Sequence, residues 1–222
     1  MKYTSVMFDL DGTLLDTIGD ITENINRTMN EFGYPLHTRD EARSYINDGA
    51  LKLIQRALPK GENSEENARR VLTRYLEIYD EHVNEHTVPY EGVKELVARL
   101  KNEGYCLSVV SNKPDRHVKL LAEHHFGKGT FSYISGTDAD TPKKPERACV
   151  EKAVMTMGIT FDGLLYVGDS HVDVQTARNA QIPCAGVTWG FHGKDGFYDK
   201  TPDFLIDNTK QLYELITNGI IQ

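Results

Sequence analysis

The 222-residue sequence predicts an α/β protein with a three-layer, Rossmann-like parallel-sheet core and an inserted α-helical cap domain. Two observations support this fold class. Short apolar runs alternate with helical patterns from residue 90 onward, and a long stretch after the first run has helical patterns alone. Because strands that alternate with helices form right-handed crossovers, the sheet should be parallel and covered by helices on both faces.

The expected strands are short runs of apolar, β-branched and aromatic residues that recur along the chain. They cover residues 5–8, 105–110, 131–135, 164–167, 184–187 and 204–206. Between these runs, apolar residues three and four positions apart predict a helix that ends before Gly104. The same spacing predicts another helix over residues 148–157, before Gly158. This alternation of strand and helix is the pattern of an α/β core.

The stretch from residue 16 to residue 89 contains several helical patterns and no convincing strand. Its last helix places apolar residues at positions 71, 72, 75, 76, 79 and 83. Pro89 and Gly92 then indicate a turn back into the core. We therefore predict a core domain made of residues 1–15 and 90–222, and a helical cap domain over residues 16–89.

Composition and charge restrict the class of partner. Hydrophobic residues make up 39% of the chain, which permits a sizeable core, and no stretch has the length of apolar residues that spans a bilayer. The first residues lead into a short apolar run unlike a secretory signal, so we expect a cytoplasmic protein without a membrane partner. A net charge of -8 disfavours nucleic-acid binding, whereas a small anionic substrate needs only a local basic pocket. Monomer and homodimer both stay open.

Polar and charged side chains follow four of the predicted strands, at the sheet edge where parallel sheets bind ligands. They are Asp9 and Asp11 after the first strand, Ser111, Asn112 and Lys113 after the second, Lys143 and Lys144 after the third, and Asp169 and Asp173 after the fourth. Carboxylates at one edge repel one another unless a cation compensates them, and oxygen ligands suit Mg²⁺. Asp9 and Asp169 could supply such ligands, while Ser111 and Lys144 could hold phosphoryl oxygens.

Four ordered motifs carry these residues. They are Asp9-Leu10-Asp11-Gly12-Thr13-Leu14-Leu15-Asp16, Ser111-Asn112-Lys113, Lys144-Pro145 and Gly168-Asp169-Ser170-His171-Val172-Asp173. With them the chain resembles the haloacid dehalogenase superfamily, in the branch with a helical cap inserted after the first strand. Residues 47–58 and 188–190 look most like bacterial phosphoglycolate phosphatases. The sequence departs from the family pattern at Gln181, where glycine is usual, and at Glu146, where a second proline is common.

The resemblance implies a Mg²⁺-dependent phosphatase that hydrolyses a small phosphate monoester through an aspartyl-phosphate. Asp9 would be the nucleophile, and Asp11 would protonate the leaving oxygen and then activate water. Asp169, Asp9 and the backbone carbonyl of Asp11 would bind the metal, with Asp173 supporting the metal site or orienting Lys144. The resemblance further implies that four residues surround the phosphate: Gly12, Ser111, Asn112 and Lys144.

Other functions on the same scaffold stay open, namely a sugar-phosphate mutase like β-phosphoglucomutase, a pyrophosphatase and a non-catalytic binding module. In the cap, Lys52 and Arg56 lie four residues apart and could bind a carboxylate of the substrate, or form a solvated helix face. Residues 82–86 fit the short zinc-protease pattern, but they lie at the end of a predicted helix and have no clear third ligand. We therefore expect a small phosphorylated metabolite as the partner.

Overall fold

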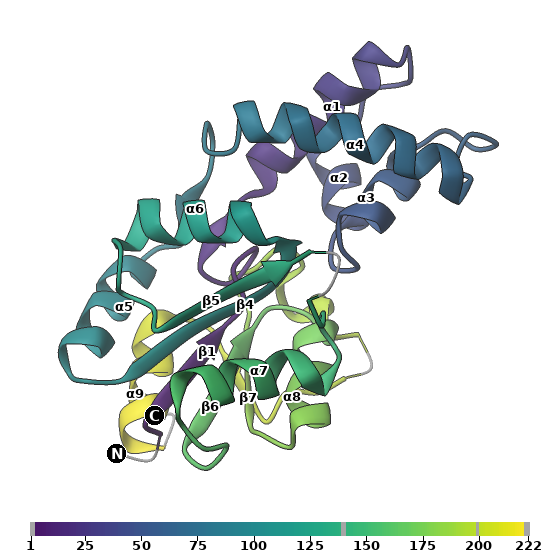
Figure 1. Ribbon diagram of the computed structural model, residues 1–222. Helices are drawn as coiled ribbons and strands as arrows, with labels where there is room; N and C mark the ends of the chain where they lie inside the picture. Colours follow the sequence, from purple (N-terminus) through teal and green to yellow (C-terminus); the bar gives the residue numbers. More distant parts are fainter. Residues whose placement is uncertain (1–2, 139–140, 199, 220–222) are drawn as a thin grey trace. The chain divides into compact units, whose positions relative to one another are not determined.

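A computed structural model describes residues 3–138, 141–198 and 200–219 (Figure 1). The chain divides into two compact units. The first, the core unit, comprises residues 1–16 and 88–222, and the second, the helical unit, comprises residues 17–87. Every strand within the described ranges belongs to the core unit.

A six-stranded parallel sheet forms the centre of the core unit, in the order β5-β4-β1-β6-β7-β8. Its strands are β1 (Ser5–Phe8), β4 (Cys106–Pro114), β5 (Tyr133–Thr137), β6 (Leu164–Gly168), β7 (Cys184–Val187) and β8 (Phe204–Ile206). Helices lie on both faces of this sheet (Figure 1). Every residue of β1, β6 and β7 is buried, as expected for strands covered on both sides. The predicted α/β fold class is confirmed.

The core helices begin and end at residues that suit helix termini. They are α5 (Val93–Asn102), α6 (Asp115–Phe126), α7 (Arg147–Met157), α8 (His171–Ala180) and α9 (Thr209–Asn218), with a short 3₁₀ turn at Gly193–Phe197. Ser170 and Asp173 form a capping box at the start of α8, which satisfies backbone N–H groups that have no partner within the helix. Gln181 ends α8 in the left-handed conformation (φ 58°), which explains why the family usually has glycine there.

The helical unit contains α1 (Ile18–Glu31), α2 (Arg39–Tyr45), α3 (Ala50–Ala57) and α4 (Glu65–Glu81). Apolar residues spaced three and four apart are buried on α1 and α4, so these two helices pack against each other. The buried carboxylate of Asp20 fixes the end of the unit, because it accepts hydrogen bonds from the backbone N–H groups of Glu85 (3.1 Å) and His86 (2.8 Å). Thr87 donates a third, from its hydroxyl group.

A two-stranded antiparallel ribbon marks the place where the chain leaves the core unit and returns to it. It consists of β2 (Leu15–Asp16) and β3 (Val88–Pro89), with Leu15 opposite Pro89. Two-residue strands are too short to show a periodicity, so the sequence pattern did not indicate this ribbon.

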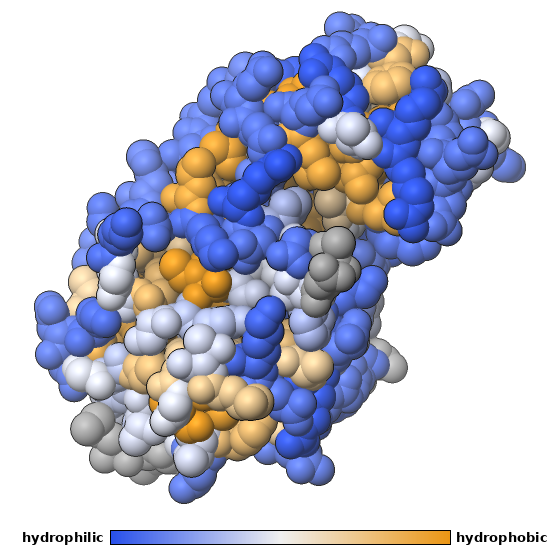
Figure 2. All heavy atoms as spheres, viewed as in Figure 1, coloured by the Kyte–Doolittle hydropathy of each residue, from blue (hydrophilic) through white to orange (hydrophobic). Residues whose placement is uncertain are grey.

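The surface is largely hydrophilic on the face drawn in Figure 2. Among the described residues, the most exposed large apolar side chains are Met155 (81% exposed) and Tyr198 (70% exposed). Within the described ranges, no helix combines the length and the apolar character needed to cross a bilayer.

Candidate active site

The turn after β1 presents Asp9 and folds the chain tightly around Leu10. The carbonyl oxygen of Leu10 accepts hydrogen bonds from the N–H groups of Thr13, Leu14 and Leu15, and Gly12 N–H donates to Leu15 O at 2.9 Å. Gly12 has φ 82°, a left-handed conformation that favours glycine. The N–H group of Gly12 is therefore used within the turn. The absence of a side chain on Gly12 also matters for the site, because it leaves space beside Asp169. The phosphate contact predicted for Gly12 from the sequence stays a prediction.

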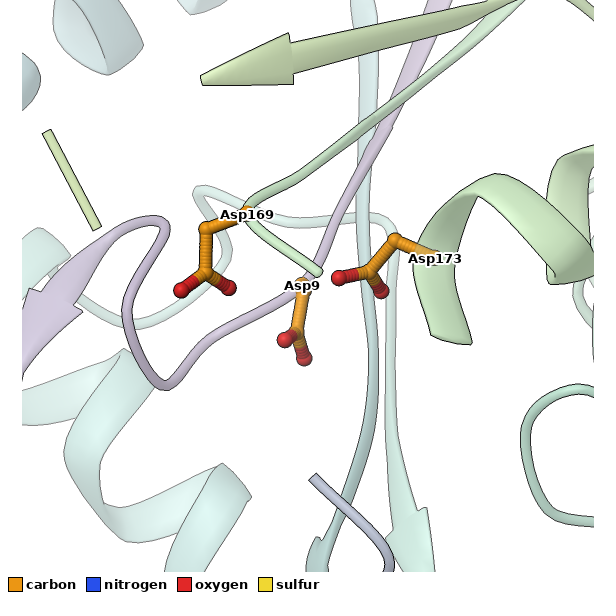
Figure 3. Close-up of side chains that lie close together, drawn as sticks. All are labelled: Asp9, Asp169 and Asp173. Atoms are coloured by element: carbon orange, nitrogen blue, oxygen red, sulfur yellow. The ribbon is translucent and has the colours of Figure 1, made fainter. Parts of the chain in front are cut away.

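Three buried carboxyl groups meet at the carboxyl ends of β1 and β6. Asp9 follows β1, Asp169 follows β6 and Asp173 lies in the first turn of α8 (Figure 3). Each offers one oxygen atom, and these atoms lie within 4.8 Å of one another. Adjacent parallel strands β1 and β6 place these residues together, although 160 positions separate the first two in the sequence.

Lys144 supplies positive charge to this cluster from a position that is 3% exposed. Its Nζ atom lies 2.8 Å from Asp9 Oδ1 and 2.8 Å from Asp173 Oδ1. Burial alone would lower the pKa of Lys144, but the charges of Asp173 and Asp9 raise it overall. Burial raises the pKa of Asp9 to about 7 even though the Lys144 charge opposes the shift. One ammonium group therefore does not fully compensate the buried acids.

Asn112 holds the backbone of Lys144 with both ends of its side-chain amide. Its Nδ2 donates to Lys144 O at 3.0 Å, and its Oδ1 accepts from Lys144 N–H at 2.9 Å. The sequence predicts that Asn112 contacts phosphate, and in the structure its side chain fixes the loop that carries Lys144. Sequence spacing could not reveal this contact, because 32 positions separate the two residues.

Asp173 has a full set of protein donors around its carboxylate. Oδ1 accepts from Lys144 Nζ (2.8 Å) and Tyr166 Oη (3.3 Å), and Oδ2 accepts from Ser170 N–H (3.1 Å) and Ser170 Oγ (2.6 Å). Four protein donors leave little room for a direct metal bond. Of the two parts predicted for Asp173, the orientation of Lys144 is the one that these contacts support.

Asp169 lies in a space that two glycines keep free of side chains. A Cβ atom would lie 2.3 Å from Asp169 Oδ2 if placed on Gly12, and 2.4 Å from it if placed on Gly190. Asp169 Oδ2 accepts a hydrogen bond from Phe191 N–H at 3.1 Å, and Thr13 Oγ1 donates to Asp169 Oδ1 at 3.4 Å. Burial raises the pKa of Asp169 well above its usual range, and the charges of Asp173 and Asp9 add to the shift.

These oxygen donors fit a hard divalent cation. The set consists of buried carboxyl oxygens. Asp9 Oδ1 forms an ion pair with Lys144, and none of the residues that the structure describes donates to it in hydrogen-bonding geometry. A cation beside Asp9 and Asp169 would replace the protons that their raised pKa values favour. The sequence marked Gly190 only as part of the resemblance over residues 188–190 and assigned it no role. The structure shows that its missing side chain leaves room for Asp169. A glycine after a strand is also an ordinary turn residue, so the sequence could not reveal this role.

Asp11 and Ser111 complete the group at this edge of the sheet. Asp11 is partly exposed, and both of its carboxylate oxygens contact Lys113 Nζ, at 3.2 and 3.4 Å. Ser111 is buried in β4, and its Oγ accepts a long hydrogen bond from Lys113 N–H at 3.4 Å. Trp189 donates from its indole to Thr13 O at 3.0 Å, so it braces the turn after β1.

The helical unit contains two further patterns that the sequence indicated, the pair Lys52 and Arg56 and the zinc-protease pattern of residues 82–86. Arg56 forms an ion pair with Asp48 and donates to Tyr45 O at 2.9 Å, while Lys52 donates to Gln55 Oε1 at 3.1 Å. The zinc-protease pattern fails, because α4 ends at Glu81 and residues 82–86 are not helical. The two histidines of that pattern therefore cannot lie one helical turn apart on one face.

A profile of the haloacid dehalogenase-like hydrolases matches residues 6–187. The chain belongs to this family. The resemblance seen in the four motifs is thereby confirmed.

Relatives with assigned names cover nearly the whole chain. A phosphoglycolate phosphatase of Pseudomonas putida is 33% identical over 93% of this chain and 77% of its own length. One from Aliivibrio fischeri is 32% identical over 96% of both chains. Among solved structures, a predicted phosphoglycolate phosphatase of Haemophilus somnus superposes with a TM-score of 0.88 at 27% identity, covering 97% of this chain and 98% of the other.

Proposed function

We propose that the protein is a Mg²⁺-dependent phosphatase that hydrolyses a small phosphate monoester through an aspartyl-phosphate on Asp9. The observation that carries the proposal is the position of Asp9, whose buried carboxyl group lies 2.8 Å from the Lys144 ammonium and beside Asp169. Family membership and the names of the relatives support the same reaction class.

Asp9 attacks the phosphorus atom, and the ester bond breaks as Asp11 gives a proton to the leaving oxygen. Asp11 then takes a proton from the water that attacks the phosphorus of the aspartyl-phosphate, which releases phosphate and restores both carboxyl groups. Ser111 Oγ and Lys144 Nζ bind phosphoryl oxygens, and Asp173 keeps Lys144 in place. The charge of Lys144 stabilises the phosphoryl group as negative charge develops on it.

Asp9, Asp169 and the backbone carbonyl of Asp11 would hold the Mg²⁺ ion. When bound, the ion neutralises charge on the phosphoryl oxygens and on the carboxylates that the core unit buries together. The all-oxygen donors and the side-chain-free space beside Asp169 support this ligand set.

The substrate that we propose is 2-phosphoglycolate or a metabolite of similar size, because the relatives from Pseudomonas putida and Aliivibrio fischeri are named phosphoglycolate phosphatases. We propose further that the helical unit acts as a cap that selects the leaving group. The point of insertion supports this role, since the chain enters the helical unit at Thr17, directly after the motif that carries Asp9 and Asp11.

Asp9→Asn tests the mechanism with little change in volume. We expect no measurable hydrolysis of 2-phosphoglycolate or of an aryl phosphate, with an unchanged circular-dichroism spectrum. Asp162→Asn, an exposed acid in the loop before β6, is the matched control and should keep full activity. Undiminished turnover by Asp9→Asn would refute the mechanism, and full activity after exhaustive chelation would refute the metal requirement.

Product analysis separates the hydrolase from its alternatives. A hydrolase releases inorganic phosphate from each ester in a panel of phosphorylated metabolites, whereas a mutase returns the phosphoryl group to a second hydroxyl of a sugar. Phosphate release from 2-phosphoglycolate well above that from sugar phosphates, nucleoside monophosphates and pyrophosphate is the expected result. A preference for pyrophosphate, or an isomerised sugar phosphate as the product, would contradict it.

A further inference from the structure

Lys113 is a buried lysine, 8% exposed, to which the proposed reaction gives no role. Its Nζ atom lies 3.2 Å from Oδ1 and 3.4 Å from Oδ2 of Asp11, so the ammonium group contacts both oxygens of one carboxylate. An ammonium group that leaves water is stable only beside a compensating charge. The Lys113 ammonium group therefore pairs with Asp11, the residue that donates and accepts the proton in the proposed reaction.

The backbone of Lys113 has a rigid support. Thr137 Oγ1 lies 3.4 Å from Lys113 O and donates to Asn112 O at 3.1 Å, which ties the end of β4 to β5. Gly136 lies so close that a Cβ atom on it would be 2.4 Å from Lys113 O. Because both strands belong to the central sheet, the ammonium group reaches Asp11 from a fixed base.

Asp11 is more exposed than the other acids beside it. It lies in the turn after β1, and its side chain is 15% exposed, whereas the side chains of Asp9 and Asp173 are 9% and 0% exposed. A proton donor must keep its oxygen within hydrogen-bond reach of the leaving atom, and a partly exposed carboxylate loses that orientation readily. A contact to both oxygens restricts the rotation of the group.

We propose that Lys113 is a positioning residue for Asp11, holding the carboxyl group in the orientation that protonates the leaving oxygen. This role rests on the proposed phosphatase function. The proton that Asp11 took from water in the preceding hydrolysis step moves from its carboxyl group to the ester oxygen as the phosphorus–oxygen bond breaks. The Lys113 ammonium group then stabilises the carboxylate that remains. Lys113 acts through Asp11 and need not touch the substrate.

The role predicts a dependence on the leaving group. An alkyl phosphate such as 2-phosphoglycolate needs a proton on its leaving oxygen, whereas 2,4-dinitrophenyl phosphate releases a stable anion without one. The ratio kcat/KM reports the step in which Asp9 takes the phosphoryl group and the leaving group departs. Lys113→Met should lower kcat/KM for 2-phosphoglycolate at least tenfold more than for the dinitrophenyl ester.

Both esters are measured on the same protein preparation, so a fraction of misfolded enzyme cancels from the comparison. Asp11→Asn serves as the reference and should show the same selective loss to a greater degree. Lys119→Met is the control, because Lys119 pairs with Asp115 at 2.6 Å on the surface and its side chain is 54% exposed. That variant should leave both rates unchanged.

Equal losses on the two esters in Lys113→Met would overturn the positioning role while leaving the phosphatase function intact. Full activity of Lys113→Met on both esters would overturn it as well. A wild-type protein that hydrolyses neither ester in the presence of Mg²⁺ would instead overturn the proposed function, and the role of Lys113 with it.

Discussion

The Lys144→Met substitution removes the ammonium group that lies 2.8 Å from both Asp9 and Asp173, and it keeps an unbranched side chain of similar length. Breaking a buried ion pair by removal of one partner costs about 3–5 kcal/mol, because the remaining charges lose their compensation. The side chain of Lys144 is 3% exposed, so solvent screens these contacts little. We expect a loss of this size in the free energy of unfolding above neutral pH.

The loss should depend on pH. The pKa of Asp9 in the folded protein is raised to about 7, so the stability contributed by its protonated carboxyl group is complete below about pH 4 and is lost as the pH rises through 7. Removing the Lys144 charge raises the pKa of Asp9 further. The variant therefore continues to lose stability above pH 7, by about 1.4 kcal/mol for each unit of additional shift. The difference in the free energy of unfolding between the wild type and Lys144→Met therefore grows as the pH rises.

Urea unfolding at pH 5.5 and pH 8.5, with a chelator present, measures this difference. Lys119→Met removes an ammonium group from an exposed pair and should change stability by less than about 1 kcal/mol at either pH. An equal loss in Lys144→Met at the two pH values would refute the electrostatic reasoning. So would a loss below about 1 kcal/mol at pH 8.5, where the buried acids need compensation most.

The contacts around the acids lead to three further predictions. Gly190→Ala places a Cβ atom 2.4 Å from Asp169 Oδ2, so it should weaken Mg²⁺ binding in calorimetry and cost about 1–3 kcal/mol. The control Gly104→Ala points into open space at φ 87° and should cost about 1 kcal/mol with unchanged Mg²⁺ affinity. Mg²⁺ affinity should rise as the pH increases toward about 7, with proton release from Asp9 visible as a buffer-dependent heat; a pH-independent affinity would contradict it. Asn112→Ala removes two hydrogen bonds to the Lys144 backbone and should lower both kcat and stability, the latter by about 1–3 kcal/mol, whereas unchanged turnover would show that the loop needs no such support.

The sequence predicted the parallel sheet well, because strands buried on both faces consist of apolar residues. Such a run can be recognised in the sequence without knowing which strands it pairs with. The misplaced boundaries have physical causes. β4 continues to Pro114, through polar residues that read as a loop, because its end pairs with β5 after a register shift. β5 begins at Tyr133, two residues after the predicted start at Phe131. Phe131 is apolar because it packs its ring against Phe126 in the core, not because it belongs to the strand.

The candidate site was predictable in its residue types and less so in its contacts. Motif order placed acids and a lysine at one sheet edge, and the structure brings Asp9, Asp169, Asp173 and Lys144 together there. The sequence could not show which partner each polar group takes. Asn112 carries an amide that suits phosphate and backbone equally, and only the fold places it beside the Lys144 backbone.

Trapping the covalent intermediate tests the central claim, that Asp9 is the nucleophile. The enzyme is mixed with Mg²⁺ and 2-phosphoglycolate, quenched in acid within milliseconds, digested and analysed by mass spectrometry. The proposed mechanism predicts a phosphoryl group on Asp9 that is absent from Asp9→Asn. With 2,4-dinitrophenyl phosphate, whose leaving group needs no proton, the phosphoryl group should be more abundant in Asp11→Asn, where water activation is impaired. Turnover without any phosphorylated peptide, or with the phosphoryl group on another residue, would contradict it.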